Sequence, residues 1–91
     1  MDMNQQSVTP NSVSLVAMRT GDTGTIVGLH GGQGMTRKLD ALGIRVGMDI
    51  TKISQQWMRG PVLLQQRNTQ VALGFRMASK VFVEPHDAKG D

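Results

Sequence analysis

The sequence of 91 residues contains no cysteine, which excludes disulfide bonds, thiolate metal sites and cysteine nucleophiles together. Tyrosine is also absent, Trp57 is the single tryptophan, and Phe75 and Phe82 are the two phenylalanines. The core must therefore be built from valine, leucine, isoleucine and methionine, and we expect both phenylalanines to join it. No apolar run approaches the roughly 20 residues that cross a bilayer, and no basic N-terminal region precedes an apolar stretch. These absences predict a soluble, cytoplasmic protein without direct membrane insertion.

The formal net charge of +3 is unevenly spread along a chain that is long enough for one domain only. Between Ser14 and Glu84 there are nine Lys or Arg against four Asp or Glu, which leaves a net charge of +5. A basic surface suits acidic partners such as nucleic acid, a nucleotide, an anionic lipid or an acidic protein face. Because no block of like charges occurs, ordinary solvated charge is the simpler interpretation.

The clearest helical pattern lies in the middle of the chain. Met35, Leu39 and Leu42 recur at i, i+4 and i+7, which predicts a short helix with all three residues on one buried face. Gly43 follows the last apolar position, where helices commonly end in the left-handed region that glycine enters without steric cost. We therefore expect Leu39 and Leu42 to pack against the strands and Gly43 to end the helix.

A turn is expected directly after this helix. Ile44 can fold back onto Leu39, which is the hydrophobic contact that accompanies a Schellman-type helix end. Gly47 can take the positive φ that a type II turn requires, and so lead the chain into a strand. The structural residues predicted for this segment are Leu39, Leu42, Gly43 and Gly47.

Most of the remaining chain has the composition of short β-strands separated by turns. In the second expected strand the apolar residues change phase between Ile50 and Ile53, which predicts a β-bulge. Gly24 and Gly28 allow a bend or a close approach of two backbones in the first. Ser14 is suited to cap a short helical turn. The expected strands are Thr23–Leu29, Met48–Gln55, Val62–Arg67, Gln70–Leu73 and Lys80–Glu84, with a further helical turn in Gly74–Ser79.

These elements predict a mainly β fold, a small SH3-like, partly open barrel of about five strands with one short α-helix and one or two helical turns. The domain is expected to span residues 14–84. Residues 1–13 are rich in polar side chains and are expected to form a disordered N-terminal tail, and residues 85–91 a C-terminal tail.

An ordered set of short motifs covers nearly the whole of this domain. They are Leu15–Gly21 with Gly24-Thr25-Ile26; Arg37-Lys38-Leu39 with Leu42-Gly43-Ile44 and Gly47; Gly60-Pro61-Val62; Val71-Ala72-Leu73; and Ala78-Ser79-Lys80-Val81-Phe82-Val83. In order and spacing these motifs resemble the FeoA family of small ferrous-iron-transport proteins. Two positions depart from the pattern, since Val46 stands where the family usually has proline and Gly74 interrupts the run after Leu73.

The resemblance implies a cytoplasmic accessory protein of ferrous iron uptake. Its implied partner is the membrane ferrous iron transporter, at the cytosolic portion that binds GTP. The module is also similar to the C-terminal domain of iron-dependent transcriptional repressors. The resemblance leaves transition-metal association and oligomeric state open.

The residues themselves offer little for catalysis or for a cofactor. His30 and His86 are the two histidines, and no HExxH, Walker-type or Rossmann-type spacing is present. The loop Gly31–Gly34 precedes a helix N-terminus, where an anion could bind, but a flexible connection is the simpler interpretation. The histidines and carboxylates show no ligand cluster, and the seven methionines are better explained as core filler than as metal ligands. We therefore expect no enzyme, no cofactor and no metal site.

Two classes of function remain, a protein-interaction module of iron transport and a nucleic-acid-binding small basic barrel. Barrels that bind nucleic acid usually stack bases on several aromatic side chains, and with three aromatic residues this chain favours the first class. From the sequence alone, Trp57 either folds over the edge of the barrel or stands exposed, and an exposed tryptophan with a neighbouring arginine is typical of interaction hot spots. The predicted partner-binding residues are Trp57, Met58 and Arg59 at a hairpin tip, with Arg37, Lys38 and Arg45 as steering charges.

Overall fold

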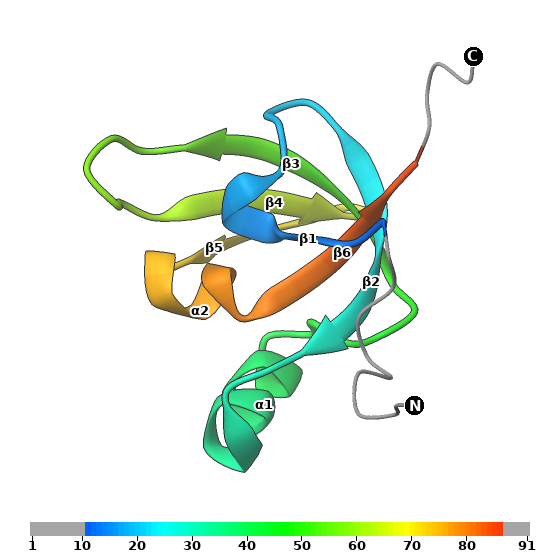
Figure 1. The fold of residues 1–91 in the computed structure, drawn as a ribbon, viewed down its shortest axis with the longest axis vertical. Coiled ribbons are helices and arrows are strands. Elements are labelled where there is room, and N and C mark those ends of the chain that lie inside the picture. Colours follow the sequence, from blue (N-terminus) through cyan, green and yellow to red (C-terminus); the bar gives the residue numbers. More distant parts are fainter. Residues whose placement is uncertain (1–10, 87–91) are drawn as a thin grey trace.

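The computed structural model describes residues 11–86, in which six strands form one antiparallel sheet with the strand order β1-β6-β2-β3-β4-β5. The sheet curves into an SH3-like barrel that is not closed, because β1 and β5 remain its two edges (Figure 1). The strands are β1 (Val13–Ser14), β2 (Thr23–Leu29), β3 (Asp49–Gln55), β4 (Val62–Gln66), β5 (Thr69–Leu73) and β6 (Val81–Pro85). The helices are α1 (Gly32–Ala41), α2 (Phe75–Ser79) and a 3-10 turn (Leu15–Ala17).

The predicted fold class is confirmed, with one strand more than expected. The additional strand β1 holds only Val13 and Ser14, which pair with Val83 and Phe82 of β6. Ser14 also caps the 3-10 turn as predicted, since its hydroxyl accepts a hydrogen bond from the N–H of Val16.

The two ends of the domain each extend beyond the expected limits. Val13, which the sequence placed in the tail, lies in β1, and Pro85 lies in β6. The N–H of His86 donates to the carbonyl of Thr23, so this residue is also held against the sheet. Of the tails expected over 1–13 and 85–91, residues 1–10 and 87–91 lie outside the described residues.

The core is aliphatic, as the shortage of aromatic residues indicated, but neither phenylalanine joins it. Phe75 and Phe82 are half-buried. Phe82 contacts the ring of His30 at a centroid distance of 4.5 Å. The expectation that both phenylalanines are core residues is therefore wrong. The buried apolar residues are Leu15, Met18, Ile26, Leu39, Ile44, Ile50, Val62, Leu64, Leu73, Ala78, Val81 and Val83.

The end of α1 confirms the predicted Schellman stop. Gly43 has φ +85°, and its N–H donates to the carbonyl of Asp40 at 2.9 Å. The N–H of Ile44 donates to the carbonyl of Leu39, also at 2.9 Å. These two hydrogen bonds satisfy carbonyl groups that the end of a helix would otherwise leave unpaired.

Leu42 is not buried, which corrects the prediction made from its spacing. The helix ends at Ala41, and Leu42 lies at the C-cap with 43% of its surface exposed. Because Gly43 reverses the chain direction, Ile44 rather than Leu42 joins Leu39 in the core, and both are fully buried. The helical period therefore places Leu39 correctly and fails at the residue where the helix stops.

Gly43→Ala is expected to destabilise the protein by about 1–2 kcal/mol, because a side chain in the left-handed region meets the following carbonyl. The added Cβ would also lie 3.0 Å from Nε2 of Gln66. Gly34→Ala is the matched control, since Gly34 lies inside α1 with open space around it. The free energy of unfolding of this control, measured by urea denaturation, should rise by about 0.5–1 kcal/mol. Equal effects of the two substitutions would contradict a special role for Gly43.

The turn after α1 also has the predicted form. Gly47 has φ +96°, and the N–H of Met48 donates to the carbonyl of Arg45 across it. Two further backbone hydrogen bonds, Gly47 N–H to Ile26 carbonyl and Ile26 N–H to Met48 carbonyl, are both 2.8 Å long. They fix the turn to β2, so that β3 starts in register beside it.

Both predicted irregularities of the sheet are present. The pairing of β3 with β4 shifts by one residue between Lys52 and Ser54, which confirms the bulge. Gly24 is buried where β2 meets β6, and a Cβ there would lie 2.5 Å from Cγ1 of Val83. Glycine is therefore required at this position by the close approach of the two strands.

Candidate interaction site

The connection between β3 and β4 projects from the barrel as a structured hairpin tip. The N–H of Gln56 donates to the carbonyl of Pro61, and that of Gly60 to the carbonyl of Trp57. Met58 and Arg59 have φ of 57° and 62°, a backbone region that non-glycine residues seldom adopt. Local strain of this kind persists only where the surrounding structure holds it. The hairpin tip therefore has a defined shape.

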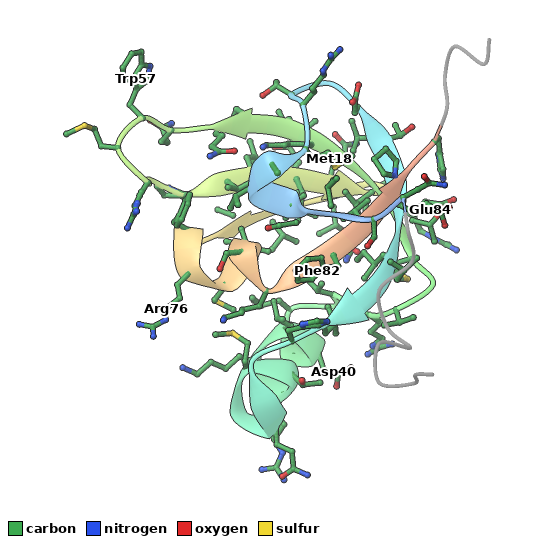
Figure 2. The ribbon with its side chains drawn as sticks, in the orientation of Figure 1. Met18, Asp40, Trp57, Arg76, Phe82 and Glu84 are labelled. Carbon is green, nitrogen blue, oxygen red and sulfur yellow. The ribbon has the colours of Figure 1, made fainter. Side chains whose placement is uncertain are left out.

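The hairpin tip presents the two most exposed large apolar side chains among the described residues. Trp57 is 88% exposed and Met58 is 89% exposed, and Figure 2 shows Trp57 standing away from the barrel. The guanidinium carbon of Arg59 lies 5.6 Å from the ring centroid of Phe75, a cation–π contact that connects the tip with α2. The three predicted residues Trp57, Met58 and Arg59 thus lie together on one exposed element.

A groove of about 570 Å³ lies beside the hairpin tip on the outer face of the sheet. Its floor is a row of side chains from three neighbouring strands, because Ser54 pairs with Leu63 and Leu63 pairs with Ala72. Trp57 and Pro61 line it from the tip. The groove is largely apolar, and it ends at the edge strand β5.

The other predicted residues lie elsewhere, on and after α1. Arg37 and Lys38 are exposed, and Arg45 follows the helix. The Nε of Arg45 donates to Oδ1 of Asp40 at 2.8 Å, between side chains that are mostly exposed. Figure 2 shows Asp40 of this helix and Trp57 of the hairpin tip at opposite ends of the molecule. The structure therefore does not bring the two predicted groups together.

The sequence analysis missed a buried lysine. Lys52 is 2% exposed, and its ammonium group donates to the carbonyls of Met18 at 2.6 Å and Val16 at 3.3 Å, and to Oε1 of Gln55. Burial lowers the pKa of Lys52 from its ordinary value of 10.5, because desolvation disfavours the charged form. Lys52 thus ties the segment after β1 to β3.

A second buried polar residue ties α1 to the sheet. Gln66 of β4 is 7% exposed, and its Nε2 donates to the carbonyl of Gly43 at 3.0 Å. Strand parity could have indicated both residues, since Gln66 follows Leu64 by two and Lys52 follows Ile50 by two. Because both side chains are polar, the sequence analysis did not assign them to the buried face.

A small polar cluster joins the C-terminal end of the domain to the sheet. The ring nitrogens of His86 lie 3.2 Å from Oγ1 of Thr23 and 2.9 Å from Oγ1 of Thr25. The hydroxyl of Thr25 donates to Oδ1 of Asp49 at 2.8 Å. Across residues 11–86 no three side chains of the metal-ligating types gather closely enough to hold an ion. In the same range no helix combines the length and the apolar character needed to cross a membrane.

Comparison with known proteins gives one family and several solved structures of the same fold. The family model of the FeoA domain matches residues 13–85. A crystal structure described as the iron uptake regulatory protein FeoA is 28% identical, covers 82% of this chain and 99% of that one, and superposes with a TM-score of 0.76. The solution structure of a FeoA-like protein from Clostridium acetobutylicum is 21% identical, covers 85% and 90% of the two chains, and gives a TM-score of 0.74.

A repressor structure shares the fold over part of its length. A manganese-dependent transcriptional repressor is 25% identical with a TM-score of 0.78, and the match covers 86% of this chain but 44% of the repressor. A search of curated proteins finds no similar sequence.

Proposed function

The chain belongs to the FeoA domain family, and we propose that it acts in ferrous iron transport by binding another protein rather than by catalysis. The family assignment suggests the role in ferrous iron transport. The proposed partner is the cytosolic GTP-binding portion of a membrane ferrous iron transporter, which the sequence resemblance implies, and the proposed place of action is the cytoplasm.

The exposure of Trp57 and Met58 is the observation that carries the interaction proposal. Two large apolar side chains are almost completely exposed on a hairpin whose backbone is held by hydrogen bonds. Neither side chain contributes to the core, so their exposure has no role in the fold. Tryptophan with a neighbouring arginine, here Arg59, is typical of residues that dominate binding energy.

The charges around α1 are proposed to steer the encounter. Arg37 and Lys38 lie far from the hairpin tip, but exposed charges act over a Debye length of about 10 Å and more at low salt. Arg45 contributes less, because Asp40 neutralises it locally. Arg37→Glu should therefore slow association and weaken its dependence on salt, while leaving the rate of dissociation unchanged.

Trp57→Ala is expected to weaken binding to the transporter's cytosolic domain by about 2 kcal/mol or more, roughly 30-fold in Kd. Titration calorimetry with both purified proteins measures the change. Leu42→Ala is the control, because Leu42 is also an exposed apolar residue but lies away from the hairpin tip, at the C-cap of α1. Parent-like affinity of the Trp57 variant would place the contact elsewhere on the protein.

The basic surface keeps nucleic-acid binding as a second candidate. Phosphate-driven binding falls steeply as salt concentration rises, so gel shifts at two salt concentrations would reveal it. Three features argue against it: Trp57 is the one highly exposed aromatic residue in the described range, Arg59 lies over Phe75, and His30 lies against Phe82. Little aromatic surface therefore remains for stacking bases.

A further inference from the structure

The edge strand β5 has none of the features that usually protect a sheet edge from pairing. Thr69–Leu73 contains no charged residue and no proline, and its pairing with β4 runs without a bulge. The opposite edge, β1, is protected by its length of two residues. An unprotected edge strand is a template for pairing with another chain.

The backbone of β5 offers free hydrogen-bonding groups at two positions. Strands β4 and β5 are joined by a two-residue loop, so Gln66 and Thr69 form the hydrogen-bonded pair next to the loop. Hydrogen-bonded and non-hydrogen-bonded pairs alternate along an antiparallel ladder. The backbone N–H and C=O groups of Gln70 and Ala72 therefore point away from β4. Within residues 11–86 these groups have no hydrogen-bond partner.

The apolar groove continues this edge. Ala72 of β5 ends the row that includes Ser54 and Leu63, and Trp57 lines the groove along this row from the hairpin tip. In a strand added to β5, the side chain opposite Ala72 would point to the same face and extend the row. The small side chain of Ala72 leaves room there for a larger apolar one.

Arginines lie on the hairpin tip and beyond both ends of β5, although Arg67, at the end away from the groove, also lines a pocket with Asp49. Residues 50–83 contain no Asp or Glu, although they contain five Lys or Arg. Arg59, Arg67 and Arg76 are exposed and lie on the hairpin tip, on the β4–β5 loop and on α2. In Figure 2 Arg76 and Trp57 both lie on the left of the view, whereas Glu84 lies on the right.

We propose that β5 is a docking edge for an extended, acidic segment of a partner protein. The segment adds a strand through the backbone of Gln70 and Ala72, and places one large apolar side chain in the groove beside Trp57. Its carboxylates face Arg59, Arg67 and Arg76. This inference deepens the proposed function by naming the mode of contact, and it rests on that function only for the identity of the partner.

Two other occupants fit the surface less well. A second copy paired through β5 would bring Arg67 of each protomer towards the Arg76 end of the other, and like charges at an interface are unfavourable. A nucleic acid would satisfy the charges, but it would use neither the free backbone groups nor the apolar groove. A peptide strand uses all three features, which is the usual pattern of recognition by strand addition.

The test uses the full chain and a synthetic peptide in which glutamates alternate with valines around a central leucine. Binding should protect the amides of Gln70 and Ala72 from hydrogen exchange, and should weaken with salt. Ala72→Pro removes one outward N–H, a substitution that edge strands tolerate, and should weaken binding by about tenfold or more. Ala72→Glu keeps the N–H but adds a like charge, so it gives a second variant if the proline disturbs folding.

Two charge reversals test whether the bound peptide lies beside Arg76. Arg76→Glu should increase its rate of dissociation, whereas Arg37→Glu, which removes the same charge from α1, should not. Absence of peptide binding, or parent-like binding of both Ala72 variants, would overturn the inference. So would displacement of the peptide by a single-stranded oligonucleotide at equal concentration, or dimerisation of the parent that Ala72→Pro abolishes.

The same variants separate this inference from the proposed function. If Trp57→Ala weakens binding of the transporter domain and the Ala72 variants bind it like the parent, the proposed function stands and the strand addition is refuted. If the peptide binds at β5 while the transporter domain does not bind, the docking edge stands and the proposed partner is wrong.

Discussion

Replacing Leu39 with alanine is expected to lower the free energy of unfolding by about 2–5 kcal/mol, while the same change at Leu42 lowers it by less than about 1 kcal/mol. Leu39 is fully buried, and Ile44 folds back beside it, so truncation leaves a cavity where α1 meets the sheet. Leu42 is 43% exposed at the end of the helix, and its truncation leaves none. For so small a domain the first loss is a large share of the total stability.

Urea unfolding followed by circular dichroism measures both losses, and the two variants serve as controls for each other. The same side chain is shortened by the same atoms three residues apart, so the difference reports burial alone. A loss at Leu42 as large as that at Leu39 would mean that α1 continues through Gly43 in solution and presents both leucines to the core. The Schellman stop would then be absent.

Three of the features that the sequence predicted correctly, at Gly43, at Gly47 and in β3, depend on local geometry. The helix stop at Gly43 and the turn at Gly47 need positive φ, which glycine supplies at low steric cost. The bulge in β3 follows from a change of phase that is visible in the order of residues. A helix stop, a turn or a bulge is determined by a few neighbouring residues, so it can be recognised from the sequence alone.

The features that the sequence did not predict depend on contacts between distant segments. Lys52 is buried because the carbonyls of Val16 and Met18, more than 30 positions earlier, meet its ammonium group. Strand β1 consists of two residues that acquire their pairing only from β6. Strand parity places Lys52 on the buried face but does not reveal the distant carbonyls that receive its hydrogen bonds, and the two residues of β1 are too few for a pattern.

The candidate site shows the same division. The sequence indicated Trp57 and Arg59 by residue type and by their place in a hairpin. It could not show that Trp57 stays exposed, or that Ala72 and Leu63 form a groove beside it, because those facts follow from the register of β3, β4 and β5. The site residues contribute little to the core, so substitutions there should change binding while leaving the fold intact.

Lys52→Met is expected to destabilise the protein by about 2–4 kcal/mol, because each buried carbonyl that loses its donor costs about 1–3 kcal/mol. The carbonyls of Met18 and Val16 both lose a charged donor, and methionine fills nearly the same volume, so little of the loss comes from a cavity. Some of it is offset, because the variant no longer buries a charge. Lys38→Met is the control, since Lys38 is exposed on α1 and should change stability by about 0.5 kcal/mol at most.

The stability of the parent should also depend on pH through Lys52. Its pKa in the folded protein lies below the ordinary 10.5, because burial disfavours the ammonium form. Between the lowered pKa and 10.5 the unfolded chain therefore binds more protons than the folded one, and the free energy of unfolding rises with pH. The parent should gain stability relative to Lys52→Met as the pH increases from neutrality towards 10.5. A gap between the two proteins that stays constant or narrows over this range would show that the three hydrogen bonds of the ammonium group outweigh its desolvation.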